Sequence, residues 1–548
     1  MSLRSTNIDR LKSETFDVLI IGGGINGAVS AAALAARGAK VALVDRGDFA
    51  GFTSMQSSNL VWGGFKYLEN YEISLVRHLC KSRNQLIKAY PENLREIRFL
   101  SALDKNSPYK PWFAGLGANA YWTIGNFFTK RPKVLSKKKI KAAEPIIDDT
   151  NVIGGIEYSD AYVIDNDSRF VFSFVRTALN FGAACVNYVR FYDAKREDGL
   201  WHLSLKDTDQ EEEFTAKAKV VINAAGPFVD SLNEKVGIKS NHRIVFSKGI
   251  HLIVPQLTKE KRVLAFFDDT QRLFYVIPMG PRSVIGTTDE RVDDPVTQVT
   301  AEDRDFLLEQ INERLALEKP LTPDDVISTR CGVRPLVVDA SGDDEDETDW
   351  TKLSRKHAVE VNQEQKYVTI YGGKITDCVN VGQEICDIVR TLGISLDKEN
   401  HDWYGEPSEG TREEFFRQAR HMGLDDIPSN DYESLSTRLW RRYGLRAFAM
   451  LEEIREDPAM ADEVIEGAEY VRCELYYAAR TEMITKFDDF LRRRSKIALV
   501  LRREDIANAE GIQEAAELLF GKYAQYRYDQ YFAPGGSADK AEKLEAGL

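Results

Sequence analysis

The sequence predicts an α/β fold that opens with a dinucleotide-binding βαβ unit and closes with an all-helical region. Three observations carry this prediction. A glycine-rich turn separates a strand from a helix near the N-terminus, two similar junctions follow much later, and strand patterns vanish after about His401. At roughly 100–200 residues per domain, a chain of 548 residues should hold two to four structural units.

The first βαβ unit is complete. Residues 16–21 have the apolar pattern of a buried parallel strand, and residues 25–37 that of a helix of small side chains. Gly38 is placed to end this helix, and residues 41–44 form the second strand.

The residues of its turn match the dinucleotide fingerprint. Gly22 makes the turn, Gly24 lets the backbone approach a pyrophosphate, and Gly27 lets the helix pack on the strand. Asp45 ends the second strand, where a carboxylate binds a pair of ribose hydroxyls. A lone glycine motif is weak, but strand, glycines, helix, strand and acid all occur here in order.

Two later junctions repeat the pattern of strand, turn and helix. One runs from a strand at 219–223 through Ala224-Ala225-Gly226-Pro227 into a helix at 228–236; the other runs from 367–371 through Gly372-Gly373 to Lys374. Between them the sequence predicts a helix at 169–181 and strands at 184–188, 201–205, 250–254, 273–277 and 283–285. We therefore expect two interleaved domains.

The C-terminal part has a different texture. Long amphipathic patterns predict helices at 435–453 and 474–494, and we place a domain boundary near residue 400. The tail from about Pro534 is polar and is expected to be disordered at its end.

The composition of the chain indicates which classes of binding partner to expect. The formal net charge of −13 argues against nucleic acid, because phosphate backbones reward an excess of Lys and Arg. The six cysteines form no CxxC pair and no His cluster completes a metal site, so we interpret them as inert thiols of a reducing cytosol.

Residues 18–36 also resemble a signal peptide or a membrane span, since they are nearly all apolar and follow basic residues. The three glycines at 22–24, Asn26 within the run and the strand that follows favour the βαβ reading instead.

The cofactor is expected to be FAD. Asp45 disfavours a ribose 2′-phosphate but does not by itself separate FAD from NAD. The later junctions at Ala224-Ala225-Gly226 and Gly372-Gly373-Lys374 look like further nucleotide contacts of flavoproteins, and a second complete fingerprint for NAD(P) is absent from the sequence.

Several distinctive motifs occur in one order along almost the whole chain, from about residue 15 to 520. They are Gly22-Gly23-Gly24-Ile25-Asn26-Gly27, Gly63-Gly64-Phe65-Lys66-Tyr67-Leu68-Glu69, Asn223-Ala224-Ala225-Gly226-Pro227, Lys248-Gly249-Ile250-His251, Val276-Ile277-Pro278, Gly286-Thr287-Thr288-Asp289, Gly332-Val333-Arg334-Pro335-Leu336, Gly372-Gly373-Lys374, Tyr477-Ala478-Ala479-Arg480 and Phe490-Leu491-Arg492-Arg493-Arg494. In these motifs the sequence resembles the FAD-dependent glycerol-3-phosphate dehydrogenases.

The resemblance implies oxidation of sn-glycerol 3-phosphate to dihydroxyacetone phosphate, with electrons passed to a quinone-type acceptor. It implies an FAD domain interleaved with an antiparallel-sheet substrate domain over residues 1–400, the substrate part at about 91–160 and 240–325, and a helical cap at 401–548. It allows peripheral association with the inner face of the cytoplasmic membrane, or a cytoplasmic location, and a homodimer. The long insertion of the related oxidases is not found.

The resemblance also assigns site residues. The expected catalytic set is Arg334, His251, Lys374, Arg355, Tyr67 and Lys66. The expected cofactor-binding set is Gly22, Gly24, Asn26, Gly27, Asp45, Ser54, Ser58, Ala225, Gly226, Gly373, Lys374, Ile375 and Thr376.

Roles follow from side-chain chemistry. Arg334 and Arg355 offer guanidinium forks to a phosphate, and Arg334 can stabilise a developing alkoxide. His251 is the expected proton acceptor, since an ordinary imidazole titrates near neutrality. Arg272 also has a counterpart in the family, with a less defined role.

Four positions depart from the family pattern. Asn59, Trp62 and Lys66 stand where the family usually has Lys, His and Arg, and Asp377 stands where it tends to have Thr. We expect Trp62, Lys66 and Asp377 near the reactive face of the flavin, where Asp377 weakens phosphate binding unless it points away or pairs with a cation. The departures keep two alternatives open: a same-fold enzyme for another polyol phosphate or hydroxy acid, and a flavin-binding protein with little turnover.

Overall fold

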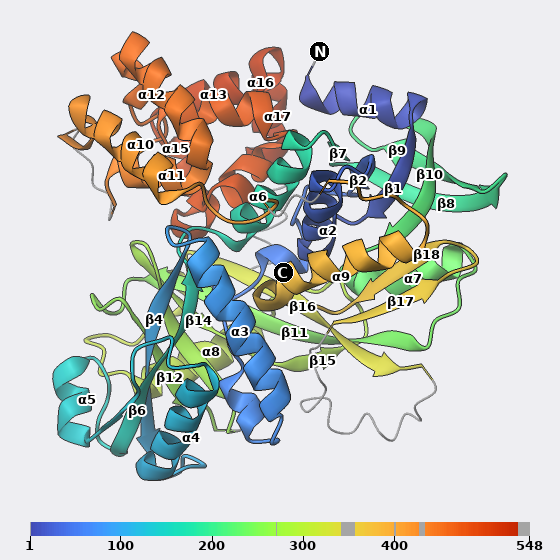
Figure 1. Cartoon of the computed structure of the whole chain (residues 1–548). Coiled ribbons are helices and arrows are strands. Elements are labelled where there is room, and N and C mark those ends of the chain that lie inside the picture. The colour runs from blue at the N-terminus through green and yellow to red at the C-terminus, as the bar shows by residue number, and fades with distance from the viewer. Residues whose placement is uncertain (1, 270, 341–356, 399–401, 427–432, 535–548) are drawn as a thin grey trace.

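The structure is a computed structural model that describes residues 2–269, 271–340, 357–398, 402–426 and 433–534. Two sheets and a helical region make up these residues. In Figure 1 the C-terminal helices lie at one end of the molecule, beside the N-terminal helix α1 (Leu3–Ser13), and strands β4, β6 and β12 lie at the other.

The first sheet has the strand order β17-β18-β10-β1-β2-β7. Its strands are β1 (Thr15–Ile21), β2 (Val41–Val44), β7 (Ala184–Val186), β10 (Glu212–Asn223), β17 (Ala358–Asn362) and β18 (Tyr367–Tyr371), with β8 (Val189–Glu197) and β9 (Leu200–Asp207) continuing it beside β10. Strands β7, β2, β1, β10 and β18 are parallel neighbours. Their carboxyl ends therefore share one edge, and the three predicted turns leave the sheet there.

Helices cover both faces of this sheet. On one face α2 (Ile25–Ala36), α6 (Asp167–Asn180) and α9 (Cys378–Thr391) pack in one hydrophobic core with β1, β2 and β18. On the other face α1 packs with β8 and β9. Every residue of α2 is buried, which explains its run of alanines and glycine.

The second sheet has the order β15-β11-β14-β13-β12-β4-β6-β3. Its strands are β3 (Leu60–Val61), β4 (Leu94–Asp104), β5 (Lys133–Leu135), β6 (Val152–Val163), β11 (His242–Pro255), β12 (Arg262–Phe267), β13 (Leu273–Met279), β14 (Arg282–Gly286), β15 (Glu290–Val292) and β16 (Ser328–Asp339). β16 pairs with β11 and β5 with β6. Pairing is antiparallel except between β12 and β4. The predicted fold class, with an antiparallel sheet interleaved in a Rossmann-like domain, is confirmed.

Helices around the second sheet are α3 (Ile73–Ala89), α4 (Pro111–Ile124), α5 (Lys137–Ala143) and α8 (Ala301–Arg314), while α7 (Val229–Lys235) follows the second glycine junction. The C-terminal helices are α10 (Glu409–His421), α11 (Leu435–Tyr443), α12 (Ala447–Glu456), α13 (Arg472–Thr481), α14 (Ile497–Val500), α15 (Arg503–Asn508), α16 (Ile512–Phe520) and α17 (Ala524–Phe532).

Two predicted helices are wrong in their continuity. The helix expected at 435–453 is broken at Gly444, whose φ of +54° ends α11. The helix expected at 474–494 ends at Thr481, and a π-helical turn at Asp489–Arg494 resumes only after an irregular stretch. Buried Glu482 lies at this break and receives hydrogen bonds from Arg169. A tertiary ion pair of this kind leaves no trace in helical periodicity.

The apolar run at 18–36 forms β1, the glycine turn and α2 rather than one long helix. Among the described residues, none of the helices has the length and apolar character to cross a bilayer. The tail predicted to be disordered lies outside the described residues beyond 534.

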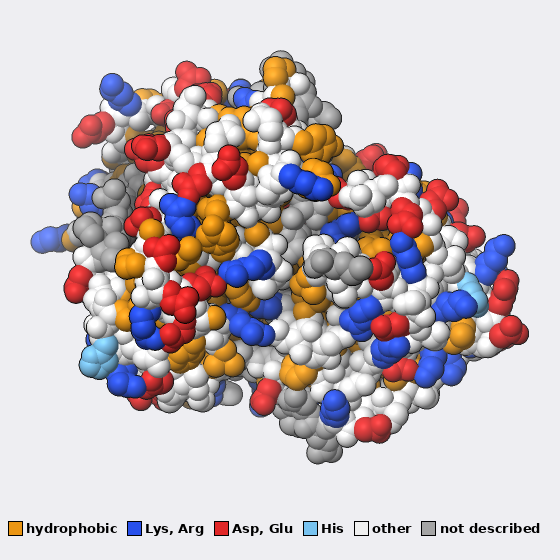
Figure 2. All heavy atoms as spheres, turned by 90° about the horizontal axis from the view of Figure 1, so that it is seen from above, with side chains coloured by type: hydrophobic (Ala, Val, Ile, Leu, Met, Phe, Trp, Pro, Cys, Tyr) orange, Lys and Arg blue, Asp and Glu red, His pale blue; other side chains and the backbone are white. Residues whose placement is uncertain are grey.

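Acidic and basic side chains are interspersed on the face shown in Figure 2, so this face carries no large patch of one charge.

All six cysteines are free, and five of them are buried. Burial raises the pKa of the Cys80 thiol to about 11 and that of Cys331 to about 12. These thiols are therefore protonated at neutral pH and unreactive, in line with the interpretation from the sequence. No group of metal-ligating side chains occurs among the residues that the structure describes.

Candidate functional site

Two of the three fingerprint glycines, Gly22 and Gly27, lie where no side chain fits. Gly22 has a φ of +107°, and a Cβ built on it would lie 2.5 Å from the carbonyl oxygen of Ala224 in the second junction. A Cβ on Gly27 would lie 1.8 Å from the carbonyl oxygen of Gly22. Gly24 is less crowded: its Cβ would meet Ser54 Oγ at 3.2 Å. The turn is thus built by close backbone approach, as the pattern predicts.

Asp45 anchors the turn from the end of β2. One carboxylate oxygen accepts the Gly23 amide at 2.6 Å and the other accepts the Gly47 amide at 2.8 Å. Burial raises the pKa of Asp45, and these two amides only partly offset it. Each oxygen keeps a second lone pair, so the carboxylate can still accept ribose hydroxyls.

The second junction packs against Gly22 through Ala224, and the third reaches the start of α2. Asn26 Nδ2 donates to the carbonyl of Gly372 at 2.8 Å, and Gly373, with a φ of +110°, lies so close to Asn26 that a Cβ would approach it to 2.7 Å. Ser54 Oγ accepts the amide of Ile25 at 3.0 Å.

The N-terminus of α2, where amides and the helix dipole attract phosphate, is thus surrounded by six of the predicted cofactor-binding residues, namely Gly22, Gly24, Asn26, Gly27, Ser54 and Gly373. Ser58 lies instead against His251. The turn closes tightly except at Gly24, and this arrangement fits FAD. The glycine turn and the N-terminus of α2 would hold the pyrophosphate, and Asp45 would hold the ribose.

Arg334 lies in the second sheet, directly opposite Ser247 in the pairing of β16 with β11. Its guanidinium donates to Thr287 Oγ1 at 2.7 Å, to the Thr288 carbonyl at 3.2 Å and to Asp289 Oδ1 at 3.0 Å. A Cβ on Gly249 would lie 2.1 Å from Arg334 Nη2, so glycine makes room for the guanidinium. Three motifs of the sequence thus meet at one arginine.

Arg272 joins the same cluster, since its guanidinium donates to the main-chain carbonyl of Asp289. Arg272 thus supports the segment around Asp289, which in turn binds Arg334. This contact gives Arg272, whose role was not defined from the sequence, a structural role. Arg355 lies outside the described residues.

His251 is buried on β11. Its Nε2 is 2.9 Å from Ser58 Oγ, and its Nδ1 is buried without a hydrogen-bond partner in the described part of the chain. Burial, together with the positive charges of Arg330 and Arg334, lowers the pKa of His251 to about 3. The expectation of an ordinary imidazole titrating near neutrality is wrong here: His251 is neutral at pH 7 and a weak base in this state.

Arg330 is a site residue that the sequence reasoning missed. It lies opposite His251 in the β11–β16 register and is fully buried. Its Nη1 donates to the Ser57 carbonyl and to Asn59 Oδ1, and Asp167 lies 3.6 Å from its Nη2. Asn59 departs from the family pattern, in which a lysine would supply a positive charge. Here the Asn59 side chain accepts a hydrogen bond from the positively charged Arg330. Only the strand register reveals this pairing.

Lys374 and Tyr67 are brought together from distant segments. Lys374 Nζ donates to the Tyr67 hydroxyl at 2.7 Å and lies 4.5 Å from the centre of its ring. The Trp62 ring packs beside Tyr67 at 5.6 Å, and Thr376 Oγ1 donates to the Trp62 carbonyl at 3.3 Å. Lys66 is exposed and takes no part in the Lys374–Tyr67 contact.

Asp377 does not present a free negative charge. Its carboxylate contacts His78 Nε2 at 2.7 Å and His357 Nδ1 at 2.9 Å. Although burial raises the pKa of Asp377, His357, Asn380 and His78 lower it to about 2. The expected weakening of phosphate binding by Asp377 is therefore not supported, because the carboxylate is paired.

The basic run at 492–496 is buried except at half-buried Arg492. Arg493 and Arg494 both bind Asp48 at 2.8 Å, and Arg492 donates to the Thr329 carbonyl. This run holds the cap on the loop that follows Asp45, so it is not a lipid-binding surface.

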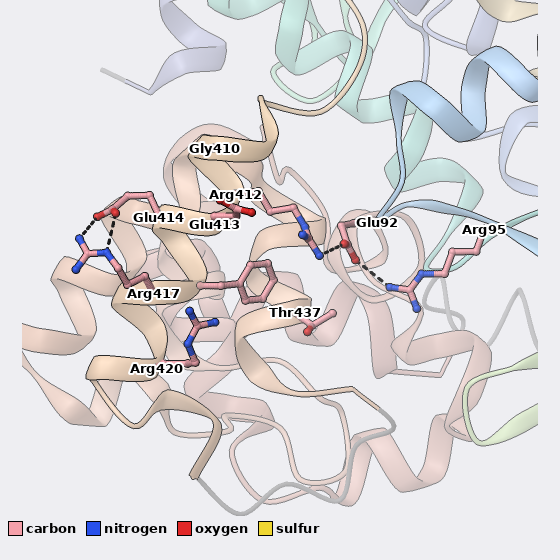
Figure 3. Close-up of a pocket in the computed structure, with 10 residues that line it drawn as sticks. Glu92, Arg95, Gly410, Arg412, Glu413, Glu414, Arg417, Arg420 and Thr437 are labelled. Atoms are coloured by element: carbon pink, nitrogen blue, oxygen red, sulfur yellow. Dashed lines mark hydrogen bonds and ion pairs between the residues drawn. The ribbon is translucent and has the colours of Figure 1, made fainter.

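A separate polar pocket of about 870 Å³ lies between the cap and the entry to β4 (Figure 3). Its charges pair internally: Arg412 and Arg95 bind Glu92, and Arg417 binds Glu414. It contains none of the predicted site residues, and the Arg412–Glu92 pair joins α10 to the segment that enters β4.

Comparison with known proteins agrees with this geometry. The family of FAD dependent oxidoreductases matches residues 17–348, and the C-terminal domain of alpha-glycerophosphate oxidase matches residues 408–524. An aerobic glycerol-3-phosphate dehydrogenase of Staphylococcus aureus (strain MRSA252) is 30% identical over 517 residues, covering 88% of this chain and 87% of that protein.

Solved structures show the same fold. The glycerol-3-phosphate dehydrogenase from Bacillus halodurans complexed with FAD gives a TM-score of 0.72 at 23% identity, covering 100% of this chain and 99% of that chain. The L-alpha-glycerophosphate oxidase from Mycoplasma pneumoniae with FAD bound gives 0.54 at 19% identity, covering 72% of this chain and 100% of that chain. With the glycine turn, Asp45 and the converging junctions in place, this chain belongs to the family of FAD-dependent oxidoreductases.

Proposed function

We propose that this protein oxidises sn-glycerol 3-phosphate to dihydroxyacetone phosphate and passes the electrons to a quinone-type acceptor. The observation that carries the proposal is a set of cations fixed by neighbouring groups: Arg334 in the second sheet, and Lys374, which follows Gly373 of the FAD cradle and binds Tyr67. The names of the relatives add support, since the dehydrogenase of S. aureus matches over most of both chains. FAD, when bound, supplies the two-electron acceptor for the C2 hydride.

The cations of the site suit a phosphate ester. Arg334 offers a guanidinium that is already oriented by Thr287 and Asp289, and Lys374 offers an ammonium oriented by Tyr67. Groups fixed before the substrate arrives cost no reorganisation during reaction. Arg334 then stabilises negative charge on the C2 oxygen as its proton leaves.

His251 is proposed as the proton acceptor through Nδ1, because Nε2 is engaged by Ser58. The neighbouring Arg330 and Arg334 disfavour the protonated ring, but a phosphate dianion bound beside them would offset that effect. Proton transfer is thereby coupled to the presence of the charged substrate.

Residues 1–400 are proposed to combine the FAD and substrate domains, with the substrate part at about 91–160 and 240–325, and residues 401–548 to form the cap. The strands of the second sheet support this division, since β4–β6 and β11–β15 come from these two stretches. The direct contacts of Arg493 and Arg494 with Asp48 support a role for the cap in holding the FAD loop.

An anaerobic titration tests the reaction. Addition of sn-glycerol 3-phosphate to the purified yellow protein should bleach the flavin absorbance and release one dihydroxyacetone phosphate per FAD. If the flavin stays oxidised with sn-glycerol 3-phosphate but bleaches with another polyol phosphate or a hydroxy acid, the protein is the alternative enzyme of the same fold that acts on that substrate. A flavin that no such substrate reduces would favour a binding protein.

A quinone acceptor requires contact with a membrane, and one surface fits this need. Residues 105–141 contain nine Lys or Arg and no Asp or Glu, in a chain of net charge −13. The same stretch exposes large apolar side chains, namely Trp112 at 65%, Phe113 at 51%, Leu116 at 61%, Phe127 at 57% and Val134 at 50%. We call this stretch, with its exposed side chains, the basic aromatic face.

The basic aromatic face includes α4 and α5, at the end of the molecule away from the cap (Figure 1). Within the described residues, three of its cations, Lys133, Lys137 and Lys141, form ion pairs, at 3.7–3.8 Å. Trp and Phe favour the membrane interface, and each Lys or Arg near anionic lipid contributes about 1 kcal/mol. We propose peripheral binding to the inner face of the cytoplasmic membrane through this surface.

Co-sedimentation with vesicles tests the surface. Binding to vesicles of phosphatidylcholine mixed with phosphatidylglycerol should exceed binding to phosphatidylcholine alone. Replacing Lys137, Lys138 and Lys139 by Glu should weaken it by about a hundredfold, from about 1 kcal/mol per cation. The control is Tyr526→Ser on α17, an equally exposed aromatic outside the face. Equal losses in both variants would contradict the assignment. A homodimer stays a prediction that sedimentation velocity tests directly.

A further inference from the structure

One buried carboxylate joins three segments that each carry or adjoin a candidate site residue. Asp377 is 5% exposed, and its Oδ1 contacts His78 Nε2 at 2.7 Å, Asn380 Nδ2 at 2.6 Å and Ser82 Oγ at 3.3 Å. Its Oδ2 lies 2.9 Å from His357 Nδ1. His78 and Ser82 belong to α3, Asn380 to α9, and His357 precedes β17.

These contacts lie close in sequence to the proposed substrate residues. The Asp377 amide donates to the Lys374 carbonyl at 3.0 Å and closes the turn Ile375–Asp377. Helix α3 begins six residues after Tyr67, the partner of Lys374. The carboxylate therefore fastens both elements whose side chains meet in the Lys374–Tyr67 contact.

His357 and Asp377 are both charged at neutral pH. Burial lowers the pKa of His357, but Asp377 and Glu384 outweigh burial and raise it to about 9. His357 Nε2 binds Glu384 Oε2 at 2.7 Å, so the imidazolium lies between two carboxylates. Among the described residues, the charged and titratable groups that face the pair are His78 from α3, and Cys378 and Glu384 from α9. A buried ion pair of this kind contributes geometric definition more than net stability.

We propose that Asp377 and His357 form a positioning pair that holds Lys374 against Tyr67 in the substrate site. This inference rests on the proposed function and deepens it. The pair acts through Lys374 and touches no substrate itself.

The pair predicts a pH limit on the alkaline side. Because the folded pKa of His357 is raised above its unfolded value of about 6.5, its contribution is full below pH 6.5 and is lost as pH rises through about 9. Asp377 has a lowered pKa, so its contribution is present above about pH 3.8 and is lost toward pH 2. Between these limits Lys374 should stay in place.

Asp377→Asn in the FAD-loaded enzyme is the primary test, since it keeps the shape and removes the charge. The titration of His357, followed by NMR of histidine-labelled protein, should move about two pH units lower. The alkaline rise in KM for sn-glycerol 3-phosphate should move with it, giving about a tenfold lower kcat/KM at pH 8. A His357 titration that moves while KM keeps its wild-type pH profile would overturn the proposal.

Three further variants keep the result interpretable. His357→Gln should remove the alkaline rise in KM for sn-glycerol 3-phosphate. This variant replaces Asp377→Asn as the primary test if Asp377→Asn does not fold. His78→Gln, a half-exposed partner of the same carboxylate, should leave the His357 titration in place. Glu384→Gln should shift that titration less than Asp377→Asn does, because the Glu384 carboxylate is more exposed to solvent than that of Asp377.

A readout without substrate separates this inference from the proposed function. The temperature at which flavin fluorescence appears on heating should fall between about pH 6.5 and about pH 9 in the wild type, and should stay nearly level over that range in Asp377→Asn. If the substrate fails to reduce the flavin, the proposed function fails, and this measurement still decides the positioning pair. Identical pH profiles of flavin release in both proteins would then overturn it.

Discussion

At the residue scale, Gly249 and Arg334 form a matched pair, because the missing Cβ leaves room for the guanidinium. Gly249→Ala should displace Arg334 without touching the FAD turn. Both Gly249→Ala and Arg334→Ala should lower kcat/KM at a cost of about 2–5 kcal/mol in transition-state stabilisation. FAD content per chain, read from the absorbance spectrum, should stay that of the wild type. Normal kcat/KM in Arg334→Ala would remove this residue from the site.

His251 gives a second prediction, on stability. Its folded pKa of about 3 lies below the unfolded value of about 6.5, so its neutral form stabilises fully above pH 6.5 and progressively less as pH falls toward 3. At pH 5 the wild type should lose about 2 kcal/mol relative to its value at pH 7 through this group alone. His251→Gln should lack that loss in denaturant unfolding, whereas His202→Gln on β9 should retain it. A pH dependence shared by all three proteins would show that other groups set it.

The sequence could predict the glycines, Asp45, Arg334, His251 and Lys374 because each lies in a local motif with a defined turn or strand. It could not predict Arg330 or the Asp377–His357 contact. Arg330 reaches His251 only through the register of β11 with β16, and His357 meets Asp377 across a hairpin and a helix start. Such contacts depend on tertiary geometry that no local pattern encodes.

At the element scale, the N-terminus of α2 is the part of the fold on which cofactor binding depends. Gly24→Val should place a branched side chain against Ser54 and in the path of the pyrophosphate, so the protein should purify with little FAD. The measurement is FAD released on denaturation, per chain. Gly410→Val in α10 is the control, since a Cβ there meets open space. Equal FAD in both variants would contradict the cradle.

Strand and helix positions show how far local patterns reach. Strands β2 and β18 lie where the sequence predicts them, because buried parallel strands are short apolar runs bounded by turns. β10 and β11 extend well beyond the predicted 219–223 and 250–254, since their outer halves are polar and pair in antiparallel ladders. The predicted cap helices fail at Gly444 and Glu482, where a left-handed turn and a buried ion pair override amphipathic periodicity.

At the scale of the whole molecule, buried ion pairs join the cap to the FAD domain. Asp165 binds Arg441 and Arg442, and Glu482 binds Arg169 of α6. A buried charge without a partner is costly. These ion pairs therefore favour the one orientation of the cap in which every one of these charges meets its partner. The cap is thereby held in one orientation over the loop that leaves β2.

Asp48 provides the sharpest test of that docking. It is 3% exposed and accepts hydrogen bonds from Arg493, Arg494 and Asn187. Although burial raises the pKa of Asp48, Arg494 and Arg493 hold it below its ordinary value. Its stabilising contribution is therefore present above about pH 3.8 and is lost as pH falls through the folded pKa.

Asp48→Ala should leave Arg494 buried without its carboxylate, while Arg493 keeps Asp488 and Asp489, at a cost of about 3–5 kcal/mol. Because Asp48 lies three residues after Asp45, the loss should reach the cofactor, and flavin fluorescence should appear at a lower temperature than in the wild type. Glu456→Ala, an exposed carboxylate at the end of α12, is the control and should change neither the denaturant midpoint nor flavin release. If Asp48→Ala unfolds the cap at lower denaturant while flavin release stays at the wild-type temperature, the cap does not hold the FAD loop, and the ion pairs stabilise the cap alone.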